Sequence, residues 1–147
     1  MKLLKLVLLL FSYSLLFGYG FSSSTKEALR VSAIKSKQNI LVQINIINGY
    51  GVQKEANNYV KLYRLRPGHK SIKNLKLKLR KYGELVKTNK KLSGYTAMQD
   101  KEYFAFLNSL SFKPKYLKGE YLVEYNLFYC SFTEGYCSVN KNITMVQ

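Results

Sequence analysis

The sequence predicts an all-β protein with the layout of an antiparallel β-sandwich. The chain has 13 Tyr and 8 Phe but no Trp and only 2 Pro, and aromatic and β-branched residues are enriched in strands. Apolar residues repeatedly alternate with polar ones, which is the period of a strand with one buried face. Turn signals separate about seven such runs, and the absence of a long helical pattern favours a sandwich.

The strands are expected where these alternating runs occur, each ended by a turn signal. The runs are Leu29–Ile34, Ile40–Ile47, Tyr59–Leu65, Tyr103–Leu107, Gly119–Cys130 and Val139–Val146. Asn48-Gly49-Tyr50-Gly51 ends the second run, and Pro67-Gly68 ends the third. Gly119–Cys130 is the longest and most regular run, with five apolar residues on one face: Tyr121, Val123, Tyr125, Leu127 and Tyr129.

The basic stretch around Leu75 fits two structures. Leu75, Leu77 and Leu79 alternate with lysine and arginine, as in a half-buried strand with a basic outer face. Spacings of three and four also fit an amphipathic helix that excludes Leu77 and includes Ile72, Leu75, Leu79, Tyr82 and Val86. We favour the strand, because it uses all three leucines. A basic helix would instead indicate binding to a membrane surface or to a partner.

The N-terminal segment Met1–Gly20 has the order of a secretory signal peptide. Lys2 and Lys5 precede an apolar stretch at Leu6–Phe17, and small residues follow. That stretch is shorter than the ~20 residues of a membrane-spanning helix, so no transmembrane domain is expected in the mature chain. Residues 21–147 are expected to form a single domain. The protein is therefore expected to be exported, either to the periplasm or as a secreted protein, where neighbouring thiols tend to form disulfides.

The chain is strongly basic. It holds 24 Lys and Arg against 8 Asp and Glu, a formal charge of +16. Without Lys2 and Lys5 the balance is 22 against 8, or +14. Such a charge attracts polyanions in a salt-dependent way. Because the lysines are spread along the chain without an arginine-rich block, a solvated surface and an anionic ligand both fit this composition.

The sequence contains few residue patterns that indicate a catalytic or metal-binding site. His69 is the one histidine and follows Pro67-Gly68 in an expected surface turn, so a histidine metal site or a Ser-His-Asp triad is not predicted. The sequence has no phosphate-binding glycine loop and no C-x-x-C motif. The only closely spaced carboxylates that draw attention are Asp100 and Glu102. We predict neither a metal nor a cofactor.

The two cysteines, Cys130 and Cys137, lie in LFYCSFTEGYCSV at the end of the longest run, with Gly135 between them. Directly opposed residues of a hairpin that exchange no hydrogen bonds have Cα atoms ~4.5 Å apart, which suits a disulfide. As a staple, a bond that closes about eight residues stabilises by roughly 2.5 kcal/mol. A loop tip is also open to a partner thiolate. The residues alone leave a structural staple and a redox pair equally open.

The stretch GEYLVEYNLFYCSFTEGYC resembles the end of the N-terminal domain of DsbD-type thiol:disulfide interchange proteins. In that family a long alternating strand runs into an aromatic-rich segment before the first cysteine. A short acidic loop then ends in Gly-aromatic-Cys, matched here by Glu134, Gly135, Tyr136 and Cys137. ILVQINIINGYGVQKEANNYVKL resembles the family's early strand and irregular stretch, and QDKEYFAF resembles its cap segment. The loop between the cysteines has six residues, one more than the family form.

This resemblance implies an immunoglobulin-like sandwich that passes electrons to or from a thioredoxin-fold partner by dithiol–disulfide exchange. It implies that Cys137 is the attacking thiol and that Cys130 is the resolving thiol. Four further residues would shield the pair and tune its ionisation: Tyr103 and Phe104 as the cap, and Asp100 and Glu102 as the acids.

A second function from a different class remains open. The chain can be a non-enzymatic exported binding module, in which the disulfide is structural and the basic surface holds an anionic ligand or an envelope protein. The sequence carries no information on oligomeric state.

Overall fold

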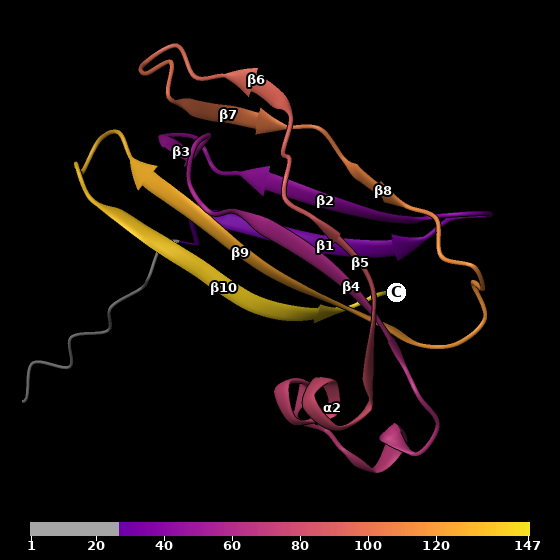
Figure 1. Ribbon diagram of the computed structural model, residues 1–147. Coiled ribbons are helices and arrows are strands. Elements are labelled where there is room, and N and C mark those ends of the chain that lie inside the picture. Colours follow the sequence, from indigo (N-terminus) through magenta and orange to yellow (C-terminus); the bar gives the residue numbers. More distant parts are fainter. Residues whose placement is uncertain (1–26) are drawn as a thin grey trace, which may run out of the picture.

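The computed structural model describes residues 27–147, and the expected signal peptide Met1–Gly20 lies outside the described residues. Ten strands, one short 3-10 helix and one α-helix follow one another in this part of the chain (Figure 1). They are β1 Leu29–Lys35, β2 Ile40–Ile46, β3 Tyr50–Gln53, β4 Tyr59–Leu65, η1 His69–Ser71, α2 Leu75–Tyr82, β5 Gly83–Asn89, β6 Gly94–Thr96, β7 Tyr103–Leu107, β8 Leu110–Phe112, β9 Tyr121–Ser131 and β10 Cys137–Met145.

The prediction of a mostly antiparallel β protein is confirmed. β1, β2 and β8 form a three-stranded sheet, and the other seven strands form a larger sheet that curls as a half-barrel. Every pairing among these strands is antiparallel. The predicted strands are all present except the one around Leu75, with ends shifted by at most two residues. The short strands β3, β6 and β8 and the seven-residue strand β5 were not predicted.

The core lies between the two sheets and follows the alternation of β9. Tyr121, Val123, Tyr125 and Leu127 belong to the buried cluster, and Tyr129 packs against it, which confirms the predicted apolar face. The small sheet contributes a second set of buried residues to the same cluster: Leu29, Ala33, Ile40, Val42, Ile44, Leu110 and Phe112. Full burial of one such large apolar side chain stabilises by about 1.5–3 kcal/mol. The even-numbered residues of β9, including Glu124, Phe128 and Cys130, therefore project from the opposite face, which we call the outer face.

The central strand β9 has three neighbours. β10 pairs with one edge of β9 from Leu122 to Cys130. The other edge is shared, because β4 pairs with the first half of β9 and β3 pairs with its last three residues. Asn58 fills the fork between β3 and β4, where it is 3% exposed. Its side chain accepts from the Phe128 N–H at 2.8 Å and donates to the Gln53 carbonyl at 2.6 Å.

The prediction of a strand around Leu75 is wrong, because Leu75–Tyr82 is the helix α2. Asn74 caps its N-terminus, and its side chain accepts from the Leu77 N–H at 3.0 Å. Leu75 and Leu79 are half-buried while Leu77 is 41% exposed, which is the pattern of the helical alternative. The helix ends at Gly83, and the chain returns at once as β5 alongside β4.

His69 is buried rather than in a surface turn, with 7% of its area exposed. Its Nε2 lies 2.8 Å from Glu120 Oε2, and its Nδ1 lies 2.7 Å from the carbonyl oxygen of Arg66. The expected turn is present just before it, since Gly68 has a φ of 96°. The imidazole thus ties η1 to the residue before β9, a structural role that the turn signal alone does not reveal.

Candidate thiol–disulfide site at the β9–β10 hairpin

The hairpin that joins β9 to β10 positions the two cysteines. Ser131 N–H donates to the carbonyl of Tyr136 at 2.8 Å, and Gly135 N–H donates back to the carbonyl of Ser131 at 3.1 Å. Gly135 has a φ of 68°, a left-handed conformation that favours glycine. Because residues 131 and 136 form the hydrogen-bonded pair, the next pair along the ladder is of the type that exchanges no hydrogen bonds.

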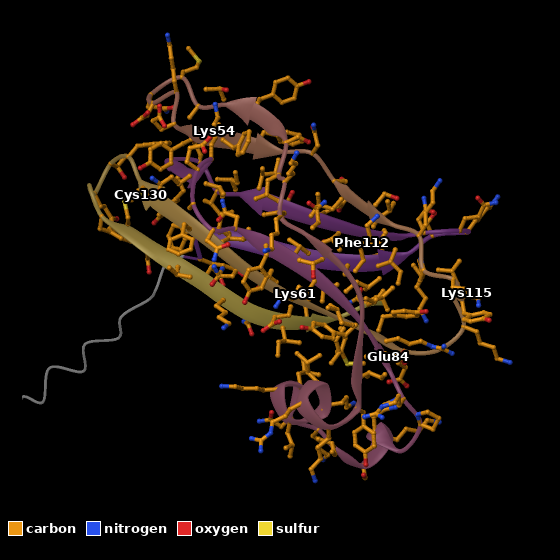
Figure 2. All side chains as sticks on the ribbon, viewed as in Figure 1. Lys54, Lys61, Glu84, Phe112, Lys115 and Cys130 are labelled. Atoms are coloured by element: carbon orange, nitrogen blue, oxygen red, sulfur yellow. A yellow bond between two sulfur atoms is a disulfide. The ribbon has the colours of Figure 1, made fainter. Side chains whose placement is uncertain are left out.

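Cys130 and Cys137 are that next pair and form a disulfide, as predicted. Their Cα atoms are 4.0 Å apart, close to the spacing of directly opposed residues without hydrogen bonds. The two cysteine residues differ in exposure: Cys130 is 7% exposed, whereas Cys137 is an exposed residue. Figure 2 shows Cys130 at the loop end of the hairpin, far from Lys115.

Of the predicted cap residues, Tyr103 lies beside Cys130. Its hydroxyl lies 3.3 Å from Cys130 Sγ, and since a disulfide sulfur has no hydrogen, the hydroxyl is the donor. The Tyr103 ring packs edge-to-face against Phe132 at a centroid distance of 5.5 Å. Edge-to-face pairs contribute about 0.5–1.5 kcal/mol beyond their buried area. We call this ring pair, whose Tyr103 hydroxyl reaches Cys130, the aromatic lid.

Gly51 makes room for the aromatic lid. It pairs with Cys130 across β3 and β9. A Cβ at this position would lie 2.5 Å from Phe132 Cζ and 2.9 Å from Tyr103 Cβ. Sequence reasoning missed both Gly51 and Phe132: Gly51 was assigned to a turn, and Phe132 was within the cysteine motif without a role. Gly51 and Phe132 come together because β3 pairs with the end of β9, and this pairing is not visible in the sequence.

The other expected cap and tuning residues lie elsewhere. Phe104, the neighbour of Tyr103 on β7, packs against the core, and Lys54 Nζ lies 5.3 Å from the centre of its ring. Asp100 and Glu102 are exposed in the turn before β7. Asp100 Oδ1 accepts from the Glu102 N–H at 2.9 Å, and the Asp100 carbonyl accepts from the Tyr103 N–H at 3.2 Å. The structure thus brings Tyr103 to the disulfide, while the two acids shape the turn that carries it.

A shallow hollow of about 200 Å³ lies beside the disulfide. Phe128 and Val139 line it together with both cysteines and Gln53, and Val139 is 43% exposed. The hollow therefore places apolar surface directly beside the disulfide. Within residues 27–147, no cluster of three or more His, Cys, Asp or Glu is suited to hold a metal ion. The same residues contain no helix with the length and apolar character needed to cross a membrane.

Comparisons with protein-family models, with curated proteins and with solved structures gave no match.

Proposed function

We propose that this chain is an exported thiol–disulfide exchange module with an immunoglobulin-like sandwich, related to the N-terminal domain of DsbD-type proteins. The observation that carries the proposal is the asymmetry of the disulfide, with Cys137 exposed and Cys130 buried under the Tyr103 hydroxyl. Two packed antiparallel sheets and a cysteine hairpin at one end support the relationship. The expected partner is a thioredoxin-fold protein.

The proposed exchange proceeds in two steps. A partner thiolate attacks Cys137 Sγ, an S–S bond forms between partner and Cys137, and the Cys130–Cys137 bond breaks with Cys130 leaving as a thiolate. The second thiolate of the partner then attacks the partner's sulfur atom in the mixed disulfide, which closes a disulfide within the partner and releases Cys137 as a thiolate. The partner is oxidised by two electrons, and this chain is reduced to two thiols after both thiolates take up protons. In the reverse direction Cys137 attacks and Cys130 resolves.

Tyr103 acts as a positioning residue in this scheme. Its hydroxyl already donates to Cys130 Sγ, and a hydrogen bond to sulfur strengthens when the sulfur becomes a thiolate. The hydroxyl therefore favours the departure of Cys130 over that of Cys137, and it sets which sulfur stays bonded to the partner. Asp100 and Glu102 contribute through the turn that holds Tyr103.

Trapping the mixed disulfide tests the proposal. A Cys130→Ser protein retains the attacking thiol. It should form a covalent adduct, which dithiothreitol dissolves, with a thioredoxin variant that keeps only its attacking cysteine, supplied as a mixed disulfide with 5-thio-2-nitrobenzoate, because neither protein then holds a resolving thiol. Cys137→Ser, the matched control, should form little adduct because its remaining thiol is buried. The reduction potential of the wild-type disulfide should lie above about −300 mV, where exchangeable disulfides are found.

The structural-staple alternative gives the opposite results. Both single substitutions would then lower the free energy of unfolding equally, by roughly 2.5 kcal/mol, and neither would form an adduct. A reduction potential below about −300 mV would agree with it. Such results would leave the chain as a binding module with a structural disulfide.

A further inference from the structure

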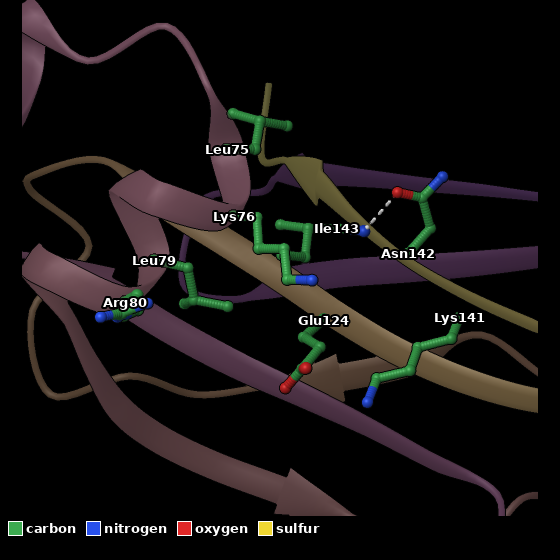
Figure 3. A pocket seen from close by; sticks show the side chains of 8 residues that line it. All are labelled: Leu75, Lys76, Leu79, Arg80, Glu124, Lys141, Asn142 and Ile143. Carbon is green, nitrogen blue, oxygen red and sulfur yellow. Dashed lines mark hydrogen bonds between the residues drawn. The ribbon is translucent and has the colours of Figure 1, made fainter.

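A groove lies at the other end of the outer face, between α2 and the strands β9 and β10 (Figure 3). Its volume is about 490 Å³, within the ~300–1,000 Å³ range of small-molecule sites. Leu75, Leu79 and Ile143 give it apolar walls, two from the helix and one from β10. The helix turns these leucines inward, because Leu77 on its opposite side is the leucine that is exposed.

Three cations line the same groove: Lys76 and Arg80 on α2 and Lys141 on β10. All three are exposed, and none forms an ion pair with a carboxylate in the part of the chain that the structure describes. They come from segments far apart in the sequence and reach the groove from both sides (Figure 3). The groove thus combines aliphatic walls with three cations that form no ion pair among the described residues.

The groove also contains one carboxylate, Glu124, which is already compensated. The Tyr63 hydroxyl donates to Glu124 Oε2 at 3.2 Å, and Lys61 Nζ lies 3.9 Å from the same oxygen. Both partners reach it from β4, on the side away from β10. The charge available to a ligand in the groove is therefore positive.

We propose that this groove binds a single-chain amphipathic anion of the fatty-acid class. The aliphatic chain would lie along Leu75, Leu79 and Ile143, and the carboxylate would contact the cations at the edge of the groove. Burial of the chain and charge pairing then act together, since each CH₂ removed from water contributes about 0.8 kcal/mol. The proposal is independent of thiol–disulfide exchange.

The arrangement of apolar groups favours this ligand over two larger anions. A flat anionic membrane would contact the outer side of α2, where Leu77 is the one exposed leucine, and would not reach the walls of the groove. A single-stranded nucleic acid would require aromatic side chains on which bases stack, and no aromatic residue lines the groove. A narrow aliphatic chain fits both the walls and the charge.

Titration calorimetry with dodecanoate below its critical micelle concentration tests the proposal. One molecule per chain should bind, and two probes separate the contributions. Dodecyl maltoside has the same chain without charge, and acetate has the charge without the chain. Each should bind at least about tenfold more weakly than dodecanoate, because each lacks one of the two contributions. Equal binding of dodecanoate and dodecyl maltoside, or no binding of dodecanoate at millimolar concentration, would overturn the proposal.

Substitutions locate the site. The triple variant Lys76→Gln, Arg80→Gln, Lys141→Gln should weaken dodecanoate binding about tenfold or more, since three charge contacts of up to about 1 kcal/mol each are lost. All three side chains are exposed, so the variant should fold. Ile143→Trp keeps the charge and fills the groove, and it should also weaken binding.

A matched control removes the same charge from lysines that do not line the groove. Lys113, Lys115 and Lys118 are exposed in the connection between β8 and β9, and their conversion to Gln should change dodecanoate binding by less than about twofold. Equal loss in both triple variants would mean that net charge alone drives binding, and it would refute the groove site. Binding to phosphatidylglycerol vesicles without binding to monomeric dodecanoate would refute it as well and would indicate a membrane surface.

Discussion

Replacing Gly51 with alanine tests whether the packing above the disulfide is as tight as the structure indicates. The new Cβ would lie 2.5 Å from Phe132 Cζ and 2.9 Å from Tyr103 Cβ. The Phe132 ring is the end of a side chain and can move, but it packs edge-to-face on Tyr103. Tyr103 Cβ is attached to the backbone of β7, so relief at that atom requires the strand itself to shift.

The expected cost is a difference of two effects. Overpacking by one carbon costs about 1–3 kcal/mol where neighbours cannot relax. Alanine in place of a strand glycine recovers roughly 0.5–1 kcal/mol, because the unfolded chain has fewer conformations to lose. With the midpoints of these ranges, about 2 and about 0.75 kcal/mol, Gly51→Ala should lower the free energy of unfolding by about 1 kcal/mol. Displacement of the aromatic lid should also accelerate reduction of the disulfide by dithiothreitol.

Urea unfolding measures the loss as a lower midpoint with an unchanged slope. The control is the same substitution in a Phe132→Ala background, where the shortest contact is absent and only the 2.9 Å contact with Tyr103 Cβ remains. The cost of Gly51→Ala should fall by about half there, which is a coupling energy of at least ~0.5 kcal/mol. A Gly51→Ala protein as stable as wild type, reduced at the same rate, would refute the tight packing of the aromatic lid.

Three further predictions concern the fold around the two sites. Asn58→Ala should lower the free energy of unfolding, measured with urea, by about 2 kcal/mol because it leaves the Phe128 N–H without an acceptor. Asn58→Asp retains an acceptor and should lose less stability. Equal losses in the two variants would contradict this role of Asn58. Burial and a neighbouring carboxylate raise the pKa of Tyr63 to about 12. Folding therefore favours the neutral phenol. Its contribution to the free energy of unfolding is complete below pH ~10 and is lost as the pH rises toward ~12. Thermal unfolding measured at a series of pH values should show a smaller loss of stability over this range in Tyr63→Phe than in the wild type. Leu79→Ser should lower the free energy of unfolding by about 1–2 kcal/mol, because Leu79 is half-buried, and Leu77→Ser should lower it by less than about 0.5 kcal/mol, because Leu77 is exposed. The reverse order would mean that α2 packs by its other face.

Strand alternation accounts for most of what the sequence predicted correctly. The five residues from Tyr121 to Tyr129 face the core because a strand places every second side chain on one face. The same rule puts Cys130 on the outer face, and the short loop between the cysteines fixes the register that places Cys137 opposite it. These features depend on residues close together in the sequence.

The helix was the ambiguous element for a physical reason. A run of Leu75, Leu77 and Leu79 satisfies the strand period, while Leu75, Leu79 and Tyr82 satisfy the helical one, and short apolar runs do not separate the two. Asn74 was the unused signal, because its side chain accepts from the Leu77 N–H as an N-cap does.

The aromatic lid was half predictable. Tyr103 and Phe104 are adjacent on β7, so alternation allows only one of them to face the disulfide, and which one depends on the register of β7 on β3. Gly51 and Phe132 meet through the pairing of β3 with β9, which no local pattern encodes. The three groove cations likewise converge only because β10 lies beside α2, which explains why they seemed evenly spread in the sequence.

The two proposed sites lie on one face of the β9–β10 ladder but at opposite ends. Cys130 and Glu124 are six positions apart on β9 and therefore point to the same side, with a separation of about 20 Å along the strand. Phe128 and Val139, a directly opposed pair, lie between the two sites. A partner that approaches Cys137 from the loop end does not need to cover α2, and a chain in the groove does not reach the disulfide. Each function should therefore survive the loss of the other: dodecanoate binding in Cys137→Ser, and adduct formation when Ile143→Trp is added to Cys130→Ser.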